Sequence, residues 1–280
     1  MTFSIVACDE AAQELGIAVA SKFLSVGAVV PWAEAGTGAV ATQALANTSY
    51  GQRGLALLRE GKSAQETLDA LVADDDGREH RQAGIVDAHG NAATFTGDKC
   101  IEYAGGIRGR DFAAQGNCLA GEAVIASLAR GFIESRGRLS YRLLNALQGG
   151  QQAGGDKRGQ QSAALIVCKP AGGYGGHTDR FVDLRVDDAA KPIDELTRIL
   201  DLHALYFFPP EPQDILEIDD RLGKEIVQHL RRSGRLIASD VFDENARTAL
   251  VEFMHVENLE ERIRDDGTID RQTVDYLRRL

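Results

Sequence analysis

Cysteine and histidine are scarce in this chain of 280 residues, and their spacing argues against the usual zinc sites. There are four cysteines and six histidines. No two cysteines form a C-x-x-C pair and the histidines show no ligand spacing, so we expect no structural metal. So few cysteines are typical of a protein in a reducing compartment.

A basic cluster and a long apolar run are also missing. The formal net charge is −11, and residues 191–280 alone carry 20 acidic against 13 basic residues. An acidic chain without a basic patch is poorly suited to nucleic acid or to an anionic membrane, so we expect neither as a partner. No segment approaches the about 20 apolar residues of a membrane span, and no basic region precedes an apolar run at the N-terminus. A cytoplasmic protein is the expectation.

What the chain does contain predicts a packed core, since 44% of its residues are hydrophobic. Strand patterns alternate with pairs of helical patterns, in the order strands, two helices, strands, two helices, strands. This order differs from the strict β-α-β alternation of a doubly wound parallel sheet. It favours an α+β fold in which two antiparallel sheets pack face to face and helices cover their outer faces.

The expected elements follow from apolar periodicity and from turn and cap residues. Ser63 and Glu66 form a capping-box pattern at the start of one helix. Strands are expected at 3–8, 17–21, 28–36, 38–46, in a hairpin over 82–98 and in a hairpin formed by 161–170 and 180–188. Helices are expected at 50–60, 63–73, 122–135, 139–148 and 191–207.

The character of the chain changes after residue 190. The helix 191–207 leads into FFPPEPQD, the densest proline stretch, which predicts a linker. Residues 214–280 then read as helices, with Asp243 and Asp270 at N-cap positions. We therefore divide the chain into a domain at 1–190, a helix and linker at 191–213, and a helical domain at 214–280.

The first residues, MTFSIVAC, raise a chemical question. If Met1 is removed, Thr2 carries a hydroxyl and a free α-amine, which is the nucleophile and base of an N-terminal threonine enzyme. The alternative is that Thr2 is simply a β-branched residue that begins an edge strand. The residues alone leave both interpretations open.

Several segments together resemble a bacterial family, the domain of unknown function 1028. They are MTFSIVA, ASKFLSVGAVVPWAEAGTGAVATQA, YGQRGLALL, REHRQAGIVD, GGDKRGQQSAALIV and RFVDLRVDD, and the resemblance covers residues 2–188. That family is similar to the N-terminal nucleophile (Ntn) hydrolases. The resemblance therefore implies a four-layer αββα sandwich in which the nucleophile begins the first strand.

The resemblance also implies roles for individual residues. Thr2 would attack, and its α-amine, with an unperturbed pKa of roughly 7.7–8, would act as the base. Lys22 would tune the nucleophile and Asp156 would orient it. Gly116 and Asn117, in a turn expected to open a helix, would stabilise the oxyanion. In the proteasome-like branch of the Ntn hydrolases, an acidic residue ends the second strand. This sequence lacks that residue.

Other residues are candidates for substrate binding or for a different nucleophile. Arg158 suits bidentate binding of a substrate carboxylate. Further candidates for the cleft are Gln43, Asn47, Ser21 and Ser162. Cys8 and Cys118 are alternative nucleophiles, although a cysteine in the first strand is typical of a small buried apolar residue. Several candidates also have a plain structural alternative. Lys22 could be a solvated lysine at a strand end, Gly116 and Asn117 could form an ordinary Gly-Asn turn, and Asp156 and Arg158 could belong to a solvated charged loop.

The hypothesis is an amidohydrolase that cleaves an amide or cyclic amide in a small, carboxylate-bearing molecule without a metal or organic cofactor. If Met1 is retained, its peptide bond blocks the amine, and the alternative is a non-catalytic binding or sensor protein. The C-terminal segments FDENARTALVEFM and DGTIDRQTVDYL resemble a peptidoglycan-binding helical module. We interpret that module as a packing or oligomer-contact element and expect a homo-oligomer.

Overall fold

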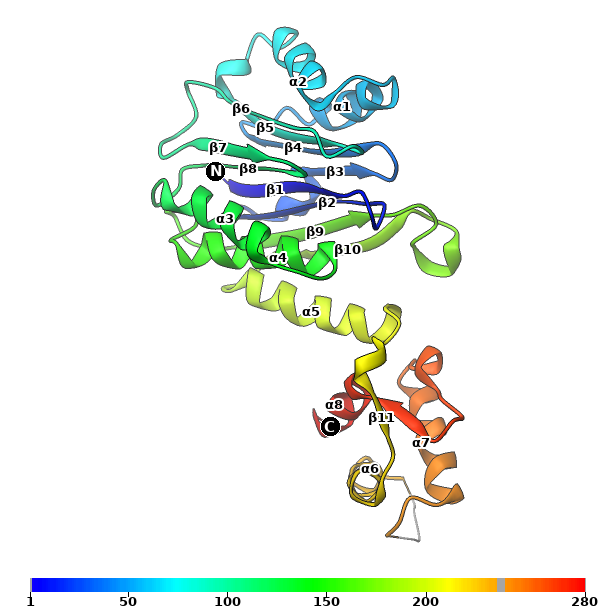
Figure 1. Ribbon diagram of the computed structural model, residues 1–280. Helices are drawn as coiled ribbons and strands as arrows, with labels where there is room; N and C mark the ends of the chain where they lie inside the picture. Colours follow the sequence, from blue (N-terminus) through cyan, green and yellow to red (C-terminus); the bar gives the residue numbers. More distant parts are fainter. Residues whose placement is uncertain (1, 236–239, 280) are drawn as a thin grey trace. The chain divides into compact units, whose positions relative to one another are not determined.

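The computed structural model describes residues 2–235 and 240–279 (Figure 1). These residues form two compact units, one up to Ile199 and one from Leu200 onward. Helix α5 (Pro192–Phe207) runs across the division. None of the described helices is both long and apolar enough to cross a membrane.

The first unit contains a six-stranded antiparallel sheet, sheet A, in the order β10-β9-β2-β1-β8-β7. Strand β1, which begins at Thr2, lies near its middle, between β2 and β8. The strands are β1 (Thr2–Asp9), β2 (Glu14–Ser21), β7 (Gly105–Gly109), β8 (Phe112–Asn117), β9 (Ser162–Cys168) and β10 (Arg180–Val186).

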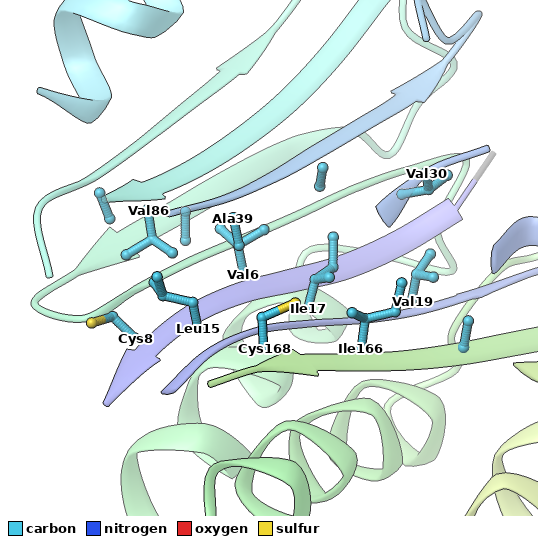
Figure 2. Packing of buried hydrophobic residues seen from close by; sticks show 14 of the residues in the cluster. Val6, Cys8, Leu15, Ile17, Val19, Val30, Ala39, Val86, Ile166 and Cys168 are labelled. Atoms are coloured by element: carbon cyan, nitrogen blue, oxygen red, sulfur yellow. The ribbon is translucent and has the colours of Figure 1, made fainter. Parts of the chain in front are cut away.

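A second antiparallel sheet, sheet B, packs against one face of sheet A. Its order is β3-β4-β5-β6, with β3 (Pro31–Glu34), β4 (Gly38–Ala44), β5 (Arg81–Asp87) and β6 (Ala92–Thr96). The core between the sheets is apolar and fully buried; Val6, Ile17 and Ile166 come from sheet A and Ala39 and Val86 from sheet B (Figure 2). In β1, alternate residues face this core, as expected for a strand buried on both sides.

Helices cover the outer faces of both sheets (Figure 1). Helices α1 (Ser49–Arg59) and α2 (Ala64–Ala73) pack on sheet B, and α3 (Ala123–Glu134) and α4 (Leu139–Gln152) pack on sheet A. The predicted capping box at the start of α2 is confirmed, because Ser63 accepts from the Glu66 N–H and Glu66 accepts from the Ser63 N–H. The four-layer αββα sandwich expected from the sequence is therefore confirmed.

Helix α4 is longer than the sequence predicts. The sequence predicts a helix that ends at Gln148, yet the helix continues to Gln152. A Cβ added at Gly149 would lie 2.8 Å from the Ser127 carbonyl oxygen of α3, and one at Gly150 would lie 3.3 Å from the Phe3 ring. These glycines therefore allow close packing of α4 on α3 and β1, which compensates for their low helix propensity.

The second unit is mainly helical. It contains α6 (Asp220–Arg232), α7 (Glu244–Val256) and α8 (Arg271–Arg279), and a two-stranded sheet of β11 (Ile215–Glu217) and β12 (Thr268–Asp270) that was not predicted. Asp243 accepts from the Ala246 N–H and Asp270 from the Thr273 N–H, so both predicted N-caps are confirmed. Short 3-10 turns lie at Val26–Ala28, Arg78–His80, Tyr174–Gly176, Pro212–Asp214 and Glu260–Arg262.

Candidate functional site

Four polar residues stand in a row across one end of sheet A. Thr2 pairs with Ser21 of β2 and with Asn117 of β8, and Ser21 pairs with Ser162 of β9. Directly opposite residues of an antiparallel pair point to the same face. The alternation along β1 through Ser4 and Val6 directs this row toward sheet B. The fold thus brings four predicted site residues, of which the first and last are 160 positions apart in the chain, to one edge of the space between the sheets.

The hydroxyl of Thr2 has a hydroxyl partner. Thr2 Oγ1 donates to Ser21 Oγ over 3.1 Å, and both residues are buried. Ser162 is bound differently, because its Oγ donates to the Phe23 carbonyl and accepts from the Val26 N–H over 3.0 Å. Ser21 is therefore in direct contact with the candidate nucleophile, whereas Ser162 fixes the loop that follows β2.

The predicted charged residues are gathered beside this row. The Lys22 N–H donates to Asp156 Oδ2 over 3.0 Å, and the Lys22 ammonium donates to the Gln160 carbonyl over 3.2 Å. Arg158 Nη2 donates to Asp156 Oδ2 over 2.6 Å. The hydrogen bonding of Arg158 to Asp156 raises the pKa of Arg158. Its guanidinium therefore stays charged and offsets the buried Asp156 carboxylate.

Backbone contacts hold the loop at residues 156–161, here called the charged loop, against the ends of β2 and β8. The Gln161 N–H donates to the Ser21 carbonyl over 3.1 Å, and the Lys157 N–H donates to the Cys118 carbonyl over 3.1 Å. Leu119 and Asp156 form an isolated antiparallel bridge. Asp156 is consequently fixed in position by the same strand ends that hold Ser21 and Asn117.

Gly116 and Asn117 do not lie at a helix N-terminus, so that part of the sequence interpretation is wrong. Both residues belong to β8, and α3 begins only at Ala123. The ladder with β1 extends to Asn117, which keeps this segment in the sheet instead of in a turn. Whatever stabilisation Gly116 and Asn117 provide must come from their own amide groups and not from a helix dipole.

A buried group of neutral side chains adjoins the row and shares Asn117 with it. This group is here called the amide cluster: Ser4, Gln43, Gln82, Gln115 and Asn117. Ser4 Oγ donates to Gln43 Oε1 over 2.7 Å and accepts from Gln115 Nε2 over 2.7 Å. Gln82 Oε1 accepts from Gln43 Nε2 over 2.8 Å and from Asn117 Nδ2 over 2.9 Å. The cluster therefore connects sheet B to the residue that lies opposite Thr2.

Sequence reasoning identified Gln43 and Asn117 but missed Ser4, Gln82 and Gln115. Gln43 Nε2 also lies 3.4 Å from the Thr2 carbonyl oxygen, which agrees with its predicted position near the nucleophile. The available signal was polar residues at alternate positions of otherwise apolar strands. Without the strand register, that signal does not show that these residues meet between the sheets.

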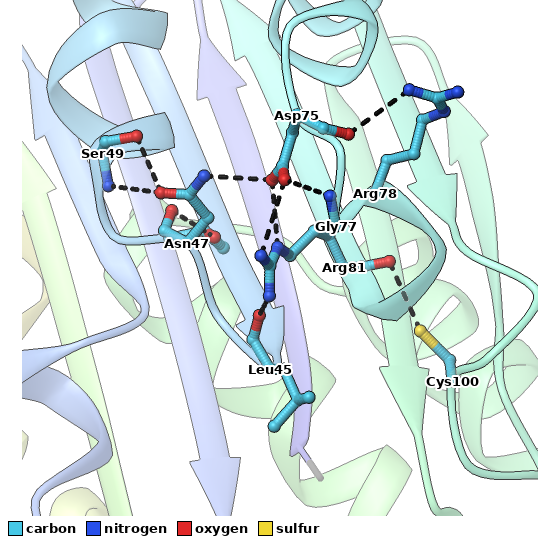
Figure 3. A network of polar contacts seen from close by, with 9 residues as sticks. Leu45, Asn47, Ser49, Asp75, Gly77, Arg78, Arg81 and Cys100 are labelled. Carbon is cyan, nitrogen blue, oxygen red and sulfur yellow. Dashed lines mark hydrogen bonds and ion pairs between the residues drawn. The ribbon is translucent and has the colours of Figure 1, made fainter.

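Asn47 belongs to a separate polar network (Figure 3). Its Nδ2 donates to Asp75 Oδ2 over 3.0 Å, and Arg81 Nε donates to the same oxygen over 3.0 Å. Arg81 also donates to the Leu45 carbonyl over 2.6 Å. The Arg81 guanidinium, with Asn47 and the Gly77 N–H, holds the pKa of Asp75 well below its usual range. The side chain of Asn47 thus anchors the loop after β4.

The first unit matches a family model described as "Family of unknown function (DUF1028)" over residues 2–196. The chain belongs to this family. A second model, described as "Putative peptidoglycan binding domain", matches residues 206–277.

One solved structure gives the same family assignment for the first unit. The crystal structure of protein SPO2555 from Silicibacter pomeroyi, also of the DUF1028 family, is 31% identical, covers 74% of this chain and 88% of that chain, and has a TM-score of 0.68. Anbu (ancestral beta-subunit) from Yersinia bercovieri is 12% identical, covers 75% and 98%, and has a TM-score of 0.33. No curated protein matches the chain.

The cysteines of the DUF1028 domain are poor candidates for the nucleophile. Cys8 lies six residues along β1 from Thr2, roughly 20 Å away at strand spacing. Burial and the nearby Asp111 raise the pKa of the Cys8 thiol to about 12, so the thiolate is disfavoured. Cys118 follows the row directly but is itself buried. Within residues 2–235 and 240–279, no group of three His, Cys, Asp or Glu residues is placed to hold a metal ion.

Proposed function

We propose that the DUF1028 domain of this chain is an N-terminal nucleophile amidohydrolase that cleaves an amide or cyclic amide in a small, carboxylate-bearing molecule. The observation that carries the proposal is the position of Thr2. Its hydroxyl is bound to Ser21 at the edge between two stacked sheets, with Asn117 and the loop of Asp156 beside it.

The chemistry requires removal of Met1, which frees the α-amine of Thr2. The amine then takes the proton of Oγ1 while the oxygen attacks the substrate carbonyl carbon. When the C–N bond breaks, the leaving nitrogen takes that proton and an ester to Thr2 remains. A water molecule, deprotonated by the same amine, hydrolyses the ester and restores the hydroxyl. Gly116 and Asn117 stabilise the oxyanion of both tetrahedral intermediates.

The charged loop supports the nucleophile in this proposal. The role assigned to Lys22 is to tune the nucleophile, and Asp156 fixes Lys22 by accepting a hydrogen bond from the Lys22 backbone N–H. Arg158, held by Asp156, offers a planar guanidinium to a substrate carboxylate. Substrate binding there would share the guanidinium between two carboxylates, which favours weak, reversible binding over tight capture.

Processing and reactivity test the proposal in two steps. Protein from the native host should lack Met1 by intact mass, and periodate should oxidise the denatured chain at its N-terminus, because this reagent cleaves a free amino alcohol. A small β-lactone should then acylate native protein at Thr2. Labelling should fall to background in Thr2→Ala and persist in Thr2→Ser, which keeps a hydroxyl next to the amine. Equal labelling of Thr2→Ala would refute the mechanism.

The alternative is a non-catalytic binding or sensor protein, and one observation favours it. The charged groups of the site are bound to one another and to backbone carbonyls, since the Lys22 ammonium donates to Gln160 and Asp156 binds Arg158. Complete retention of Met1 in the native host would support this alternative, because the amine would then be an amide nitrogen.

For the second unit we propose a packing or oligomer-contact role within a homo-oligomer. The family match of residues 206–277 keeps glycan binding as the competing role. Light scattering of the full chain measures the oligomeric state. Co-sedimentation of the full chain with purified peptidoglycan tests the competing role, and retention in the pellet would favour it.

A further inference from the structure

We propose that Gln82 is a positioning residue that sets the orientation of the Asn117 amide, so that Asn117 Oδ1 accepts a hydrogen bond from the α-amine of Thr2. The inference rests on the proposed function, because it requires the amine to be free. It assigns a purpose to the amide cluster, which shares Asn117 with the row of site residues.

The orientation of Gln82 is fixed by groups that can only accept hydrogen bonds. Its Nε2 lies 2.8 Å from the Gly116 carbonyl oxygen and 3.1 Å from the Gly105 carbonyl oxygen. A backbone carbonyl cannot donate, so the nitrogen and not the oxygen of Gln82 must face this side. Gln82 Oε1 is therefore directed to the other side, where it accepts from Gln43 and Asn117.

The orientation of Gln82 in turn determines that of Asn117. Because Gln82 Oε1 only accepts, Asn117 must present Nδ2 to it, over 2.9 Å. Asn117 Oδ1 is then turned away from Gln82. This oxygen is fully buried and has no hydrogen-bond partner among the residues that the structure describes. Buried carbonyl oxygens without a donor are rare, so a donor is to be sought nearby.

A candidate donor belongs to Thr2. Thr2 and Asn117 are directly opposite in the β1–β8 ladder, with their side chains on one face and Cβ atoms about 5 Å apart in such a pair. Removal of Met1 turns the backbone nitrogen of Thr2 into an amine with additional N–H groups. An N–H held by Asn117 Oδ1 would orient the amine so that its lone pair can face Oγ1. The second hydrogen of Asn117 Nδ2 can still serve the oxyanion.

The test compares rates of Thr2 acylation by a β-lactone in the full, processed chain. Gln82→Met and Asn117→Leu should each slow acylation at least tenfold. The double variant should be no slower than Asn117→Leu alone, because Gln82 acts through Asn117. The control is Gln115→Met, which alters an equally buried amide of the cluster that bonds to Ser4 and not to Asn117; its rate should stay within twofold of the wild type.

A wild-type rate in Gln82→Met, an equal loss in Gln115→Met, or additive losses in the double variant would overturn the proposal. A second measurement needs neither variant to fold. Side-chain amide signals of Asn117 in ¹⁵N spectra should differ between the processed chain and a chain prepared with methionine aminopeptidase inhibited. Only in the processed chain is the α-amine of Thr2 free; in the other chain the same nitrogen belongs to the peptide bond with Met1. Identical signals would overturn the inference even if Thr2 proves reactive, and shifted signals in an unreactive protein would support it while the proposed function fails.

Discussion

The two units of the chain each bury a polar group, and the two groups differ in kind. In the first unit the amide cluster is neutral and spans two sheets. In the second unit the buried group is ionic, with Arg262 Nη1 donating to Asp270 Oδ1 over 2.6 Å and both side chains at most 2% exposed. One group lies beside a candidate nucleophile, whereas the other lies within a helical core.

The difference is in how completely each group is satisfied. Arg262 also donates to the carbonyls of Ala204, Leu205 and Phe208 and to Gln272 Oε1. Asp270 accepts from Thr273 as the cap of α8. The amide cluster instead leaves Gln115 Oε1 and Asn117 Oδ1 without a partner among the described residues. The ionic group is thus saturated with hydrogen bonds, whereas the amide cluster leaves an acceptor beside the candidate nucleophile for the donor proposed above.

The largest effect is expected from breaking the ionic group. Arg262→Met leaves the Asp270 carboxylate buried without its partner, which should lower the free energy of unfolding of the second unit by about 3–5 kcal/mol. Native-state hydrogen exchange in α7 measures this loss without involving the first unit. The double variant Arg262→Met/Asp270→Leu should recover much of it. A loss no larger than that of the exposed Arg278→Met would contradict the comparison.

An intermediate effect is expected for the ionic network of the first unit. Asp75→Asn should lower the free energy of unfolding by about 2 kcal/mol at pH 7, since hydrogen bonds to a charged group are lost. The pKa of Asp75 is depressed in the folded state. Its contribution is therefore present above the ordinary carboxyl pKa and is lost as the pH falls toward the folded value.

Urea unfolding followed by the fluorescence of Trp32, the single tryptophan, measures this effect. The difference between the wild type and Asp75→Asn should shrink below about pH 4. The exposed neighbour Asp74 is the matched control, and Asp74→Asn should change stability little at any pH. A difference that grows in acid would show that the charge of Asp75 is not the cause.

The smallest effect is expected for the neutral group. Gln115→Met removes hydrogen bonds to Ser4 but also removes an oxygen that has no partner, so we expect a loss of about 1 kcal/mol in the same urea assay. Gln115→Ala should cost more, because it adds a cavity. If Gln115→Met were as damaging as Arg262→Met, the neutral group would be as important for stability as the ionic one.

The fold could be predicted from local signals wherever those signals agreed with tertiary packing. The Ser63 capping box, the Asp243 cap and the hairpin of β9 and β10 were all visible in the sequence and are confirmed. The extension of α4 through Gly149 and Gly150 was not visible. Glycine propensity favours a break there, and only the approach of α3 makes the helical conformation favourable.

The candidate site could be predicted only in part, for a related reason. Thr2 was a candidate from the first residues alone, and the family resemblance added Ser21 and Asn117; strand pairing places the three side by side. Gln82 was not found, because its contact with Asn117 depends on how β5 of sheet B packs against β8 of sheet A. Asn47 was assigned to the cleft from its position after β4, but Asp75 binds its side chain elsewhere.

The close packing of α4 has a consequence beyond the helix itself. Asp156 follows the end of α4 by four residues, through Gly154 and Gly155, both at positive φ. A side chain at Gly149 would push the helix outward and would shift the starting point of the segment that delivers Asp156 to the strand ends. Gly149 has no side chain, and this absence lets α4 pack closely enough for the following segment to place the Asp156 carboxylate at the strand ends.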